Sequence, residues 1–332
     1  MSCTTIDPQK ARNAIKNKLD FFNLKPPASV TQTDVIERLD ASYEIFTQVI
    51  ETDKKGVEKS VYGFKGDKER AFKLRVGEWV QEQLKRSPSQ NTSKTGKLKM
   101  EAGTFVHSGM QFIIEDLYNN GGKDLAKIES NFIKGFGGSF KSSSKVFKSL
   151  VELSKSLIKE INDTQDEINR RTGDKTGKAI IRTEMILTDP VQDRAGTADL
   201  VVVYSDATGS IYDFKTSEYA GDLSYNLIGW NKFEGYQIQM NDYSRMLQER
   251  YQLKGMRKTR LVPIQLNLKS TITKGKPTVY FKEITDVIHS TEFTKIMPVS
   301  AERTMTKEID DMLHKQFSII KTYQERMRAT KD

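Results

Sequence analysis

The sequence contains a single cysteine, Cys3, among its 332 residues. One thiol excludes an internal disulfide, and it also excludes a zinc site or iron–sulfur cluster held by four cysteines of this chain. Such sparing use of cysteine is typical of a reducing compartment, and we therefore expect a cytoplasmic location.

Long apolar runs are also missing, and we expect no targeting segment. No apolar run approaches the length of about 18 residues that a transmembrane helix requires. The first residues lack the apolar stretch of a secretory signal, and Asp7 and Asp20 argue against a transit peptide. The phosphate-binding pattern Gly-x-x-x-x-Gly-Lys-Ser/Thr does not occur, and residues 173–178 have the wrong spacing for it.

Acidic residues are outnumbered by basic ones. The chain has 53 Lys and Arg against 44 Asp and Glu, which gives a net charge of +9. This balance favours a polyanionic partner such as nucleic acid, although an ordinary basic protein remains the plainer alternative. A hydrophobic content of 36% is enough for a globular core, and the length allows one large domain or two ordinary ones.

Hydrophobic spacing predicts a mixed α/β protein. Residues 1–100 are expected to form an N-terminal helical region packed on a core of residues 101–332. Loops are expected at 51–68 and 87–99, with a Gly- and Ser-rich stretch at 119–143. The expected helices are 8–22, 33–49, 69–84, one starting at 103, 146–168, 233–251 and 305–327. The expected strands are 180–187, the two halves of 199–215, 260–268 and 278–284.

The segment 199–215 has the pattern of a β-hairpin with acidic residues on both strands. Its first half is apolar and largely β-branched, and a turn sequence follows. The return strand ends in Asp213, Phe214 and Lys215. The turn length places Asp199 within one position of Asp213. Asp213 and Lys215 share a face because side chains alternate along a strand, while Phe214 points the other way.

Two carboxylates beside a lysine suit metal-assisted hydrolysis of a phosphodiester. Carboxylate oxygens are the ligands that Mg²⁺ prefers, and a bound ion screens the phosphate and acidifies water. Lys215 would hold or deprotonate the attacking water, or neutralise the transition state. The alternative, a solvated strand edge whose charges pair at a spacing of two residues, stays open at this point.

Three short motifs follow one another in a fixed order. Residues 103–107 read Gly-Thr-Phe-Val-His, residues 196–215 join Gly-x-x-Asp to Asp-x-Lys, and residues 239–243 read Gln-Met-Asn-Asp-Tyr. The ordered set resembles the RecB-like branch of the PD-(D/E)XK nuclease superfamily. Residues 27–31 also resemble the Pro-Ser-Val-Thr entry of mitochondrial genome maintenance exonuclease and phage exonucleases, with one alanine inserted. The resemblance implies a restriction-endonuclease-like core, in which helices flank a mixed central sheet.

The resemblance also implies roles for individual residues. Lys215 would be the catalytic lysine, and the residues of the third motif would orient it or the scissile strand. His289 and His314 match no motif and are expected to be structural or surface residues. The implied ligands of Mg²⁺ or Mn²⁺ are His107, Asp199, Asp213 and the backbone carbonyl of Phe214. The implied catalytic residues are Asp199, Asp213, Lys215, Gln239, Tyr243 and Glu184.

Basic and hydroxyl side chains are candidates for guiding DNA. A lysine face on 145–159 is a further candidate, although such a face is usually only solvated. Trp79 and Trp230 would either stack on bases or, as we favour, pack in the core. The candidate DNA-binding residues are Thr216, Ser217, Lys94, Lys97, Lys99, Lys175 and Lys178.

Together these observations predict a metal-dependent DNA nuclease. The resemblance implies an exonuclease acting on single-stranded DNA or DNA ends in replication, repair or recombination. A catalytically degenerate nucleic-acid-binding module and an RNA endonuclease of the same fold are the alternatives. A helicase or single-strand-binding protein would be a separate chain, and neither a membrane nor an iron–sulfur cluster is expected.

Overall fold

The computed structural model describes residues 29–52, 58–65, 72, 74–84, 94–137, 143–189, 192–217, 230–271, 280–289 and 294–295. The helices expected at 8–22 and 305–327, and with them His314, lie outside these residues. Within the described part of the chain, no helix combines the length and the apolar character needed to cross a membrane.

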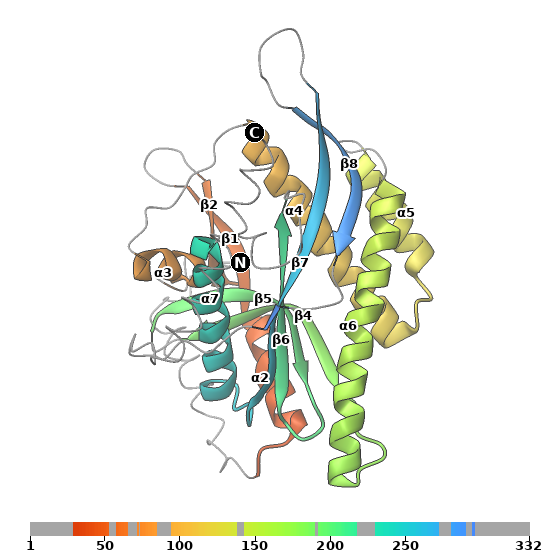
Figure 1. The fold of residues 1–332 in the computed structure, drawn as a ribbon. Coiled ribbons are helices and arrows are strands. Elements are labelled where there is room, and N and C mark those ends of the chain that lie inside the picture. Colours follow the sequence, from red (N-terminus) through yellow and green to blue (C-terminus); the bar gives the residue numbers. More distant parts are fainter. Residues whose placement is uncertain are drawn as a thin grey trace, which may run out of the picture.

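A seven-stranded mixed sheet forms the centre of the molecule (Figure 1). Neighbouring strands β5 and β6 are antiparallel, whereas β6 and β7 are parallel. The expectation of a mixed α/β architecture is therefore confirmed. The strands of this sheet are β3 Leu74–Arg75, β4 Ile180–Asp189, β5 Arg194–Val203, β6 Gly209–Ser217, β7 Met256–Thr271, β8 Tyr280–His289 and β9 Thr294–Lys295.

Helices cover both faces of the sheet (Figure 1). Helices α4, α5 and α6 pack on one face against Leu200 and Val202, while α2, α3 and α7 pack on the other against Val201 and Val203. The apolar run in β5 follows from this arrangement, since both of its faces are buried. The helices are α2 Gln32–Ile45, α3 Val76–Gln83, α4 Lys94–Glu115, α5 Leu125–Gly137, α6 Ser143–Thr172 and α7 Trp230–Glu249.

The edge of β5 that faces β6 is shared between two strands. β6 pairs with residues 200–203 of β5, and β3 pairs with residues 194–195. Between them, residues 196–199 have no described strand along this edge, although β4 pairs along the opposite edge. Side chains from other elements can therefore approach these four residues.

Helix α4 is longer than expected. The Ser-, Thr- and Lys-rich composition of 87–99 predicts a loop, but residues 94–99 form the first turns of α4. Ala102, Val106 and Met110 are fully buried in the core of one sheet face, and this packing outweighs the local composition. As a result His107 lies in the middle of a helix, not in its first turn, and α5 occupies much of the stretch 119–143.

The N-terminal part contains strands where helices or loops were expected. Helix α2 is capped by Thr31, whose hydroxyl accepts a hydrogen bond from the Asp34 backbone N–H at 3.3 Å, and it ends at Ile45, before the expected residue 49. An antiparallel hairpin follows, made of β1 Phe46–Thr52 and β2 Glu58–Phe64. The helix expected from residue 69 begins only at Val76, after β3. The region before residue 100 is thus not purely helical, and that boundary falls inside α4.

Candidate metal centre

Asp199 lies where β5 and β6 separate. Leu200 and Tyr212 form the last pair of the ladder on this side. Beyond it, the Asp199 Oδ2 atom accepts a hydrogen bond from the backbone N–H of Phe214 at 2.5 Å. The Oδ1 atom lies 3.4 Å from Nδ1 of His107. Burial alone would raise the pKa of Asp199, but His107, Lys215 and the Phe214 N–H together lower it.

His107 extends toward Asp199 from the middle of α4. Its ring packs nearly perpendicular to the Phe214 ring, at 81° and with 6.0 Å between centroids. Burial favours the neutral imidazole, but the Asp199 carboxylate raises the pKa of His107 above its ordinary value. One turn earlier, a Cβ atom on Gly103 would lie 3.0 Å from Oγ1 of Thr216. The glycine of the first motif therefore allows α4 to pack closely on β6.

Glu184 lies opposite Asp199, where the pairing of β4 with β5 is interrupted. The pairing passes from Thr183 with Leu200 to Met185 with Ala198, so it leaves out both acids while the register stays the same. The φ of 46° at Glu184 lies in the left-handed region that residues with a Cβ seldom adopt. His107, Glu184 and Asp199 each offer one ligand atom, and these three atoms lie within 4.8 Å of one another. Strands β4 and β5 and helix α4 thus contribute one potential ligand each.

The donor set fits a divalent cation. Burial, together with the charge of Asp199, raises the pKa of Glu184 to about 7. A cation at this point would offset the repulsion between the two carboxylates. Two carboxylates with one imidazole are ligands that Mn²⁺ accepts readily, while the carboxylates alone suit Mg²⁺.

Asp213 and Lys215 form an ion pair next to this cluster. They share a face of β6, as expected from their spacing, and the Lys215 Nζ lies 2.5 Å from the Asp213 Oδ2. The amine also lies 4.6 Å from the centre of the Tyr236 ring on α7. Burial raises the pKa of Asp213 to about 6. Burial would lower the pKa of Lys215, but Asp213 and Asp199 raise it overall, so the amine stays protonated.

The structure therefore assembles the expected ligand set only in part. Asp213 was expected among the metal ligands, but within the described residues the mutually close ligand atoms come from His107, Glu184 and Asp199. Asp213 contacts Lys215. The sequence resemblance placed Glu184 among the catalytic residues, and its position opposite Asp199 places it among the potential ligands.

Gln239 and Tyr243 interact with each other on α7. The Gln239 amide donates a hydrogen bond to the Tyr243 hydroxyl at 3.2 Å, one helical turn away. Tyr243 is buried against β5, where a Cβ atom on Gly196 would lie 2.6 Å from its Cε1 atom. The glycine of the second motif and the tyrosine of the third are thus fitted to each other.

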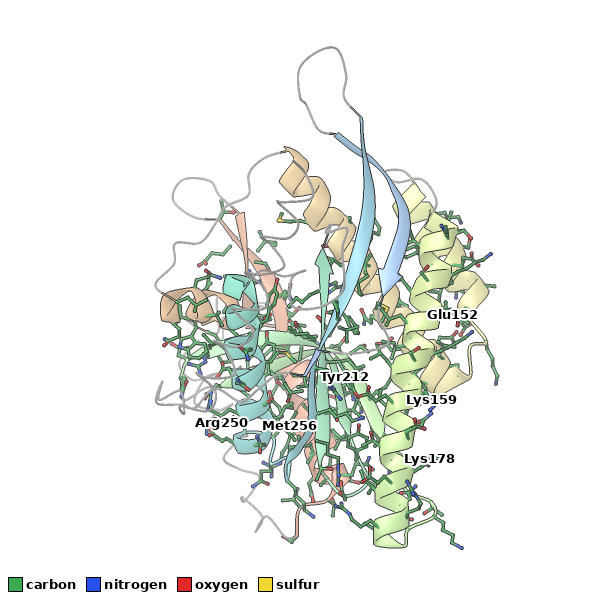
Figure 2. All side chains as sticks on the ribbon, in the orientation of Figure 1. Glu152, Lys159, Lys178, Tyr212, Arg250 and Met256 are labelled. Atoms are coloured by element: carbon green, nitrogen blue, oxygen red, sulfur yellow. The ribbon has the colours of Figure 1, made fainter. Side chains whose placement is uncertain are left out.

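The candidate DNA-binding residues come from separate elements. Thr216 is half-buried beside α4, and Ser217 ends β6. Lys94, Lys97 and Lys99 lie in the first turns of α4, where side chains are not described. Lys175 and Lys178 are exposed after α6. The Gln32 amide contacts both the Lys178 and Val203 carbonyls, so this loop lies at the turn end of β5, and Figure 2 places Lys178 low on the molecule.

The remaining aromatic and lysine candidates have structural surroundings. Trp79 packs on the α7 side of the sheet, with the Arg194 guanidinium 3.9 Å above its ring. This packing supports the prediction that Trp79 belongs to the core. The Trp230 side chain is not described. Lys155 and Lys159 are exposed on α6 and pair with acids of the same helix at 2.8 and 2.6 Å.

Sequence reasoning missed two groups of polar residues near the cluster. Glu115 accepts hydrogen bonds from Thr183 and Gln111 and adds to the raised pKa of Glu184. Its spacing of eight residues from His107 puts both on one face of α4, which is a signal that the sequence offered. The second group surrounds Thr197 and includes residues of the unexpected β1–β2 hairpin.

Comparisons with known proteins add little to this picture. No family model matches the sequence, and no curated protein matches it. Among solved structures, a protein named "Putative exonuclease" from Eubacterium rectale is 13% identical over 73% of this chain and 71% of its own, with a TM-score of 0.26. A protein named SSO0001 is 16% identical over 64% of this chain and 77% of its own, with a TM-score of 0.16. Neither likeness is close enough to establish a shared fold.

Proposed function

We propose that this protein is a divalent-metal-dependent nuclease that hydrolyses phosphodiester bonds in DNA. The observation that carries the proposal is the convergence of His107, Glu184 and Asp199 within 4.8 Å, with the Asp213–Lys215 ion pair beside them. The preference for DNA, the exonuclease mode and the action on single strands or ends are supported by the motif resemblance.

The residues around the cluster have complementary roles in this proposal. A divalent ion held by His107, Glu184 and Asp199 would supply Lewis-acid chemistry to the phosphodiester. The protonated amine of Lys215 would stabilise the negative charge that develops on the phosphate. Asp213 keeps that amine charged and in place through its 2.5 Å contact, and Gln239 and Tyr243 support the adjoining strand.

Cleavage of labelled oligonucleotides tests the proposal. Wild type is incubated with end-labelled single-stranded DNA, duplex DNA and RNA in Mg²⁺, in Mn²⁺ and in chelator. We expect stepwise shortening of single-stranded DNA, no reaction in chelator, and a loss of at least about 100-fold in Asp213→Asn and Asp199→Asn. A circular single strand, which has no end, should resist cleavage.

Other outcomes decide between the alternatives. Preferential cutting of RNA would identify an RNA endonuclease, and binding without cleavage in either metal would identify a nucleic-acid-binding module. Cleavage by Asp213→Asn at the wild-type rate would contradict the assigned site. Cutting of the circular single strand would support the nuclease proposal but exclude an exonuclease that requires a free end. A separate helicase or single-strand-binding protein should accelerate the digestion of duplex DNA only.

A further inference from the structure

The β1–β2 hairpin is a separate two-stranded sheet that contacts the central sheet beside the metal cluster. Its strands pair in register, with Gln48 opposite Tyr62 and Ile50 opposite Ser60. Because side chains alternate along a strand, these four residues lie on one face of the hairpin. Val49 lies on the other face.

Thr197 of β5 is the point of contact. The Tyr62 hydroxyl lies 2.7 Å from Oγ1 of Thr197, and the Gln48 amide donates to the same oxygen at 3.2 Å. Thr197 belongs to the stretch 196–199, which has no described strand along its free edge. The hairpin therefore reaches the opening in the sheet from which Asp199 faces His107.

Tyr62 brings the hairpin close to the potential ligands. Its side chain is buried, and burial together with the charge of Glu184 raises the pKa of the hydroxyl. Phe46 lies on the same face and packs with Tyr62, Phe72 and Ile186 in a small apolar core. One end of the hairpin face is thus anchored beside the cluster.

The same face continues beyond Thr197 into an exposed part of the hairpin. The Ser60 hydroxyl donates to the Gln48 side-chain carbonyl at 3.2 Å. Ile50 follows on this face and is 62% exposed, which makes it one of the most exposed large apolar side chains among the described residues. An amide, a hydroxyl and an exposed apolar group therefore extend in a row from the cluster.

We propose that this face of the β1–β2 hairpin is the surface that holds the polynucleotide strand next to the scissile phosphate. The Gln48 amide has a second N–H to donate to a phosphate or sugar oxygen, the Ser60 hydroxyl orients that amide, and Ile50 offers apolar contact to a sugar or base. Tyr62 is a positioning residue that fixes the hairpin to Thr197. These contacts do not read sequence. The inference rests on the proposed function for its substrate, a single-stranded polynucleotide.

Binding and kinetics of exposed-residue variants test the inference. Binding of a fluorescent oligothymidylate is followed by anisotropy in Ca²⁺ to limit turnover. We expect Ile50→Ser and Gln48→Ala each to raise Kd by about fivefold or more, because each removes a contact worth about 1 kcal/mol. Val49→Thr makes a similar change on the opposite face and should stay within about twofold of wild type.

Kinetics then separate substrate holding from folding. With Mg²⁺, Ile50→Ser should raise KM and leave kcat unchanged, and its unfolding temperature should match that of wild type because Ile50 is exposed. Tyr62→Phe and Thr197→Val should each weaken binding. The double variant should be no weaker than Thr197→Val alone, since that substitution already removes the hydrogen bond to Tyr62 together with the one from Gln48.

The outcomes distinguish this inference from the nuclease proposal. If the protein never cleaves but the hairpin variants still bind the oligonucleotide more weakly, the proposed binding surface is supported and only the nuclease proposal is rejected. Wild-type affinity in both Ile50→Ser and Gln48→Ala, or an equal loss in Val49→Thr, would overturn the hairpin surface even if cleavage is observed. Absence of any nucleic-acid binding by wild type would overturn both.

Discussion

Lys215 is the clearest single side chain on which to test the chemistry. Its amine is buried beside Asp213 and Asp199 but is not among the potential ligand atoms. We expect Lys215→Ala to lower kcat by at least about 100-fold while Mn²⁺ affinity, measured by calorimetry, changes less than about threefold. Lys258→Ala is the matched control, because it removes an ion-paired lysine from neighbouring β7. A large loss of Mn²⁺ affinity in Lys215→Ala would mean that Lys215 contributes to metal binding.

The raised pKa of Glu184 predicts how the free energy of unfolding changes with pH. Its carboxyl keeps its proton to a pH of about 7 in the folded chain, whereas the unfolded chain releases it near the ordinary value of 4.5. Between these pH values the unfolded state binds fewer protons, so stability falls as pH rises.

Removing this titration should stabilise the metal-free protein. We expect the free energy of unfolding of Glu184→Gln to exceed that of wild type by about 1–2 kcal/mol at pH 8, and by less at pH 5. Denaturant titrations in chelator at the two pH values measure this difference. Saturating Mn²⁺ should reverse the order, because only the wild-type carboxylate binds the ion. Equal free energies of unfolding for wild type and Glu184→Gln at pH 8 would contradict the conclusion that the Glu184 carboxyl is buried and repelled by Asp199.

Among the elements, α7 is fixed to β5 by the fit between Tyr243 and Gly196. A Cβ atom at residue 196 would collide with the tyrosine ring. We expect Gly196→Ala to cost about 1–3 kcal/mol and to lower turnover, because Tyr243 and Gln239 must shift. Thermal unfolding and the cleavage assay measure the two effects. Gly77→Ala on α3, where nothing lies within 4 Å, is the control and should be neutral or stabilising.

The elements differ in how far their own sequence determines them. The 199–215 hairpin could be predicted because its apolar run, its turn and its short-range pairing are local. Helix α6 could be predicted from the regular spacing of its buried leucines. The β1–β2 hairpin was not predicted, although Asp53 and Gly56 have the spacing of a turn, because Phe46 and Tyr62 are buried partly against Ile186, which is distant in sequence. Tertiary packing decides such strands.

The same distinction applies to the candidate site. Asp199, Asp213 and Lys215 follow from strand alternation within one hairpin. The position of Glu184 among the potential ligands depends on its place opposite Asp199 in the β4–β5 register and on a left-handed φ, and this φ has no sequence signature for glutamate. The contact of Thr197 with Tyr62 joins residues 135 positions apart. Nothing in the local sequence around either residue indicates that contact.

For the whole molecule, the net charge of +9 predicts salt-sensitive binding. Binding of a basic protein to a polynucleotide releases counterions, so affinity falls as salt rises. We expect the Kd for the fluorescent oligonucleotide to rise at least about tenfold between roughly 50 and 200 mM salt. A neutral competitor polymer at equal mass should leave the Kd unchanged. An affinity independent of salt would contradict binding through phosphate contacts.

Asp199 makes two separate contacts, and only one of them would still be needed in a descendant without nuclease activity. One oxygen faces His107, while the other closes the junction between β5 and β6 through the Phe214 N–H. A descendant that no longer cleaves could replace His107 or Lys215 without opening that junction. At position 199 the backbone still requires an acceptor, and asparagine supplies one without the charge. Asparagine is therefore the residue we expect at this position in inactive descendants.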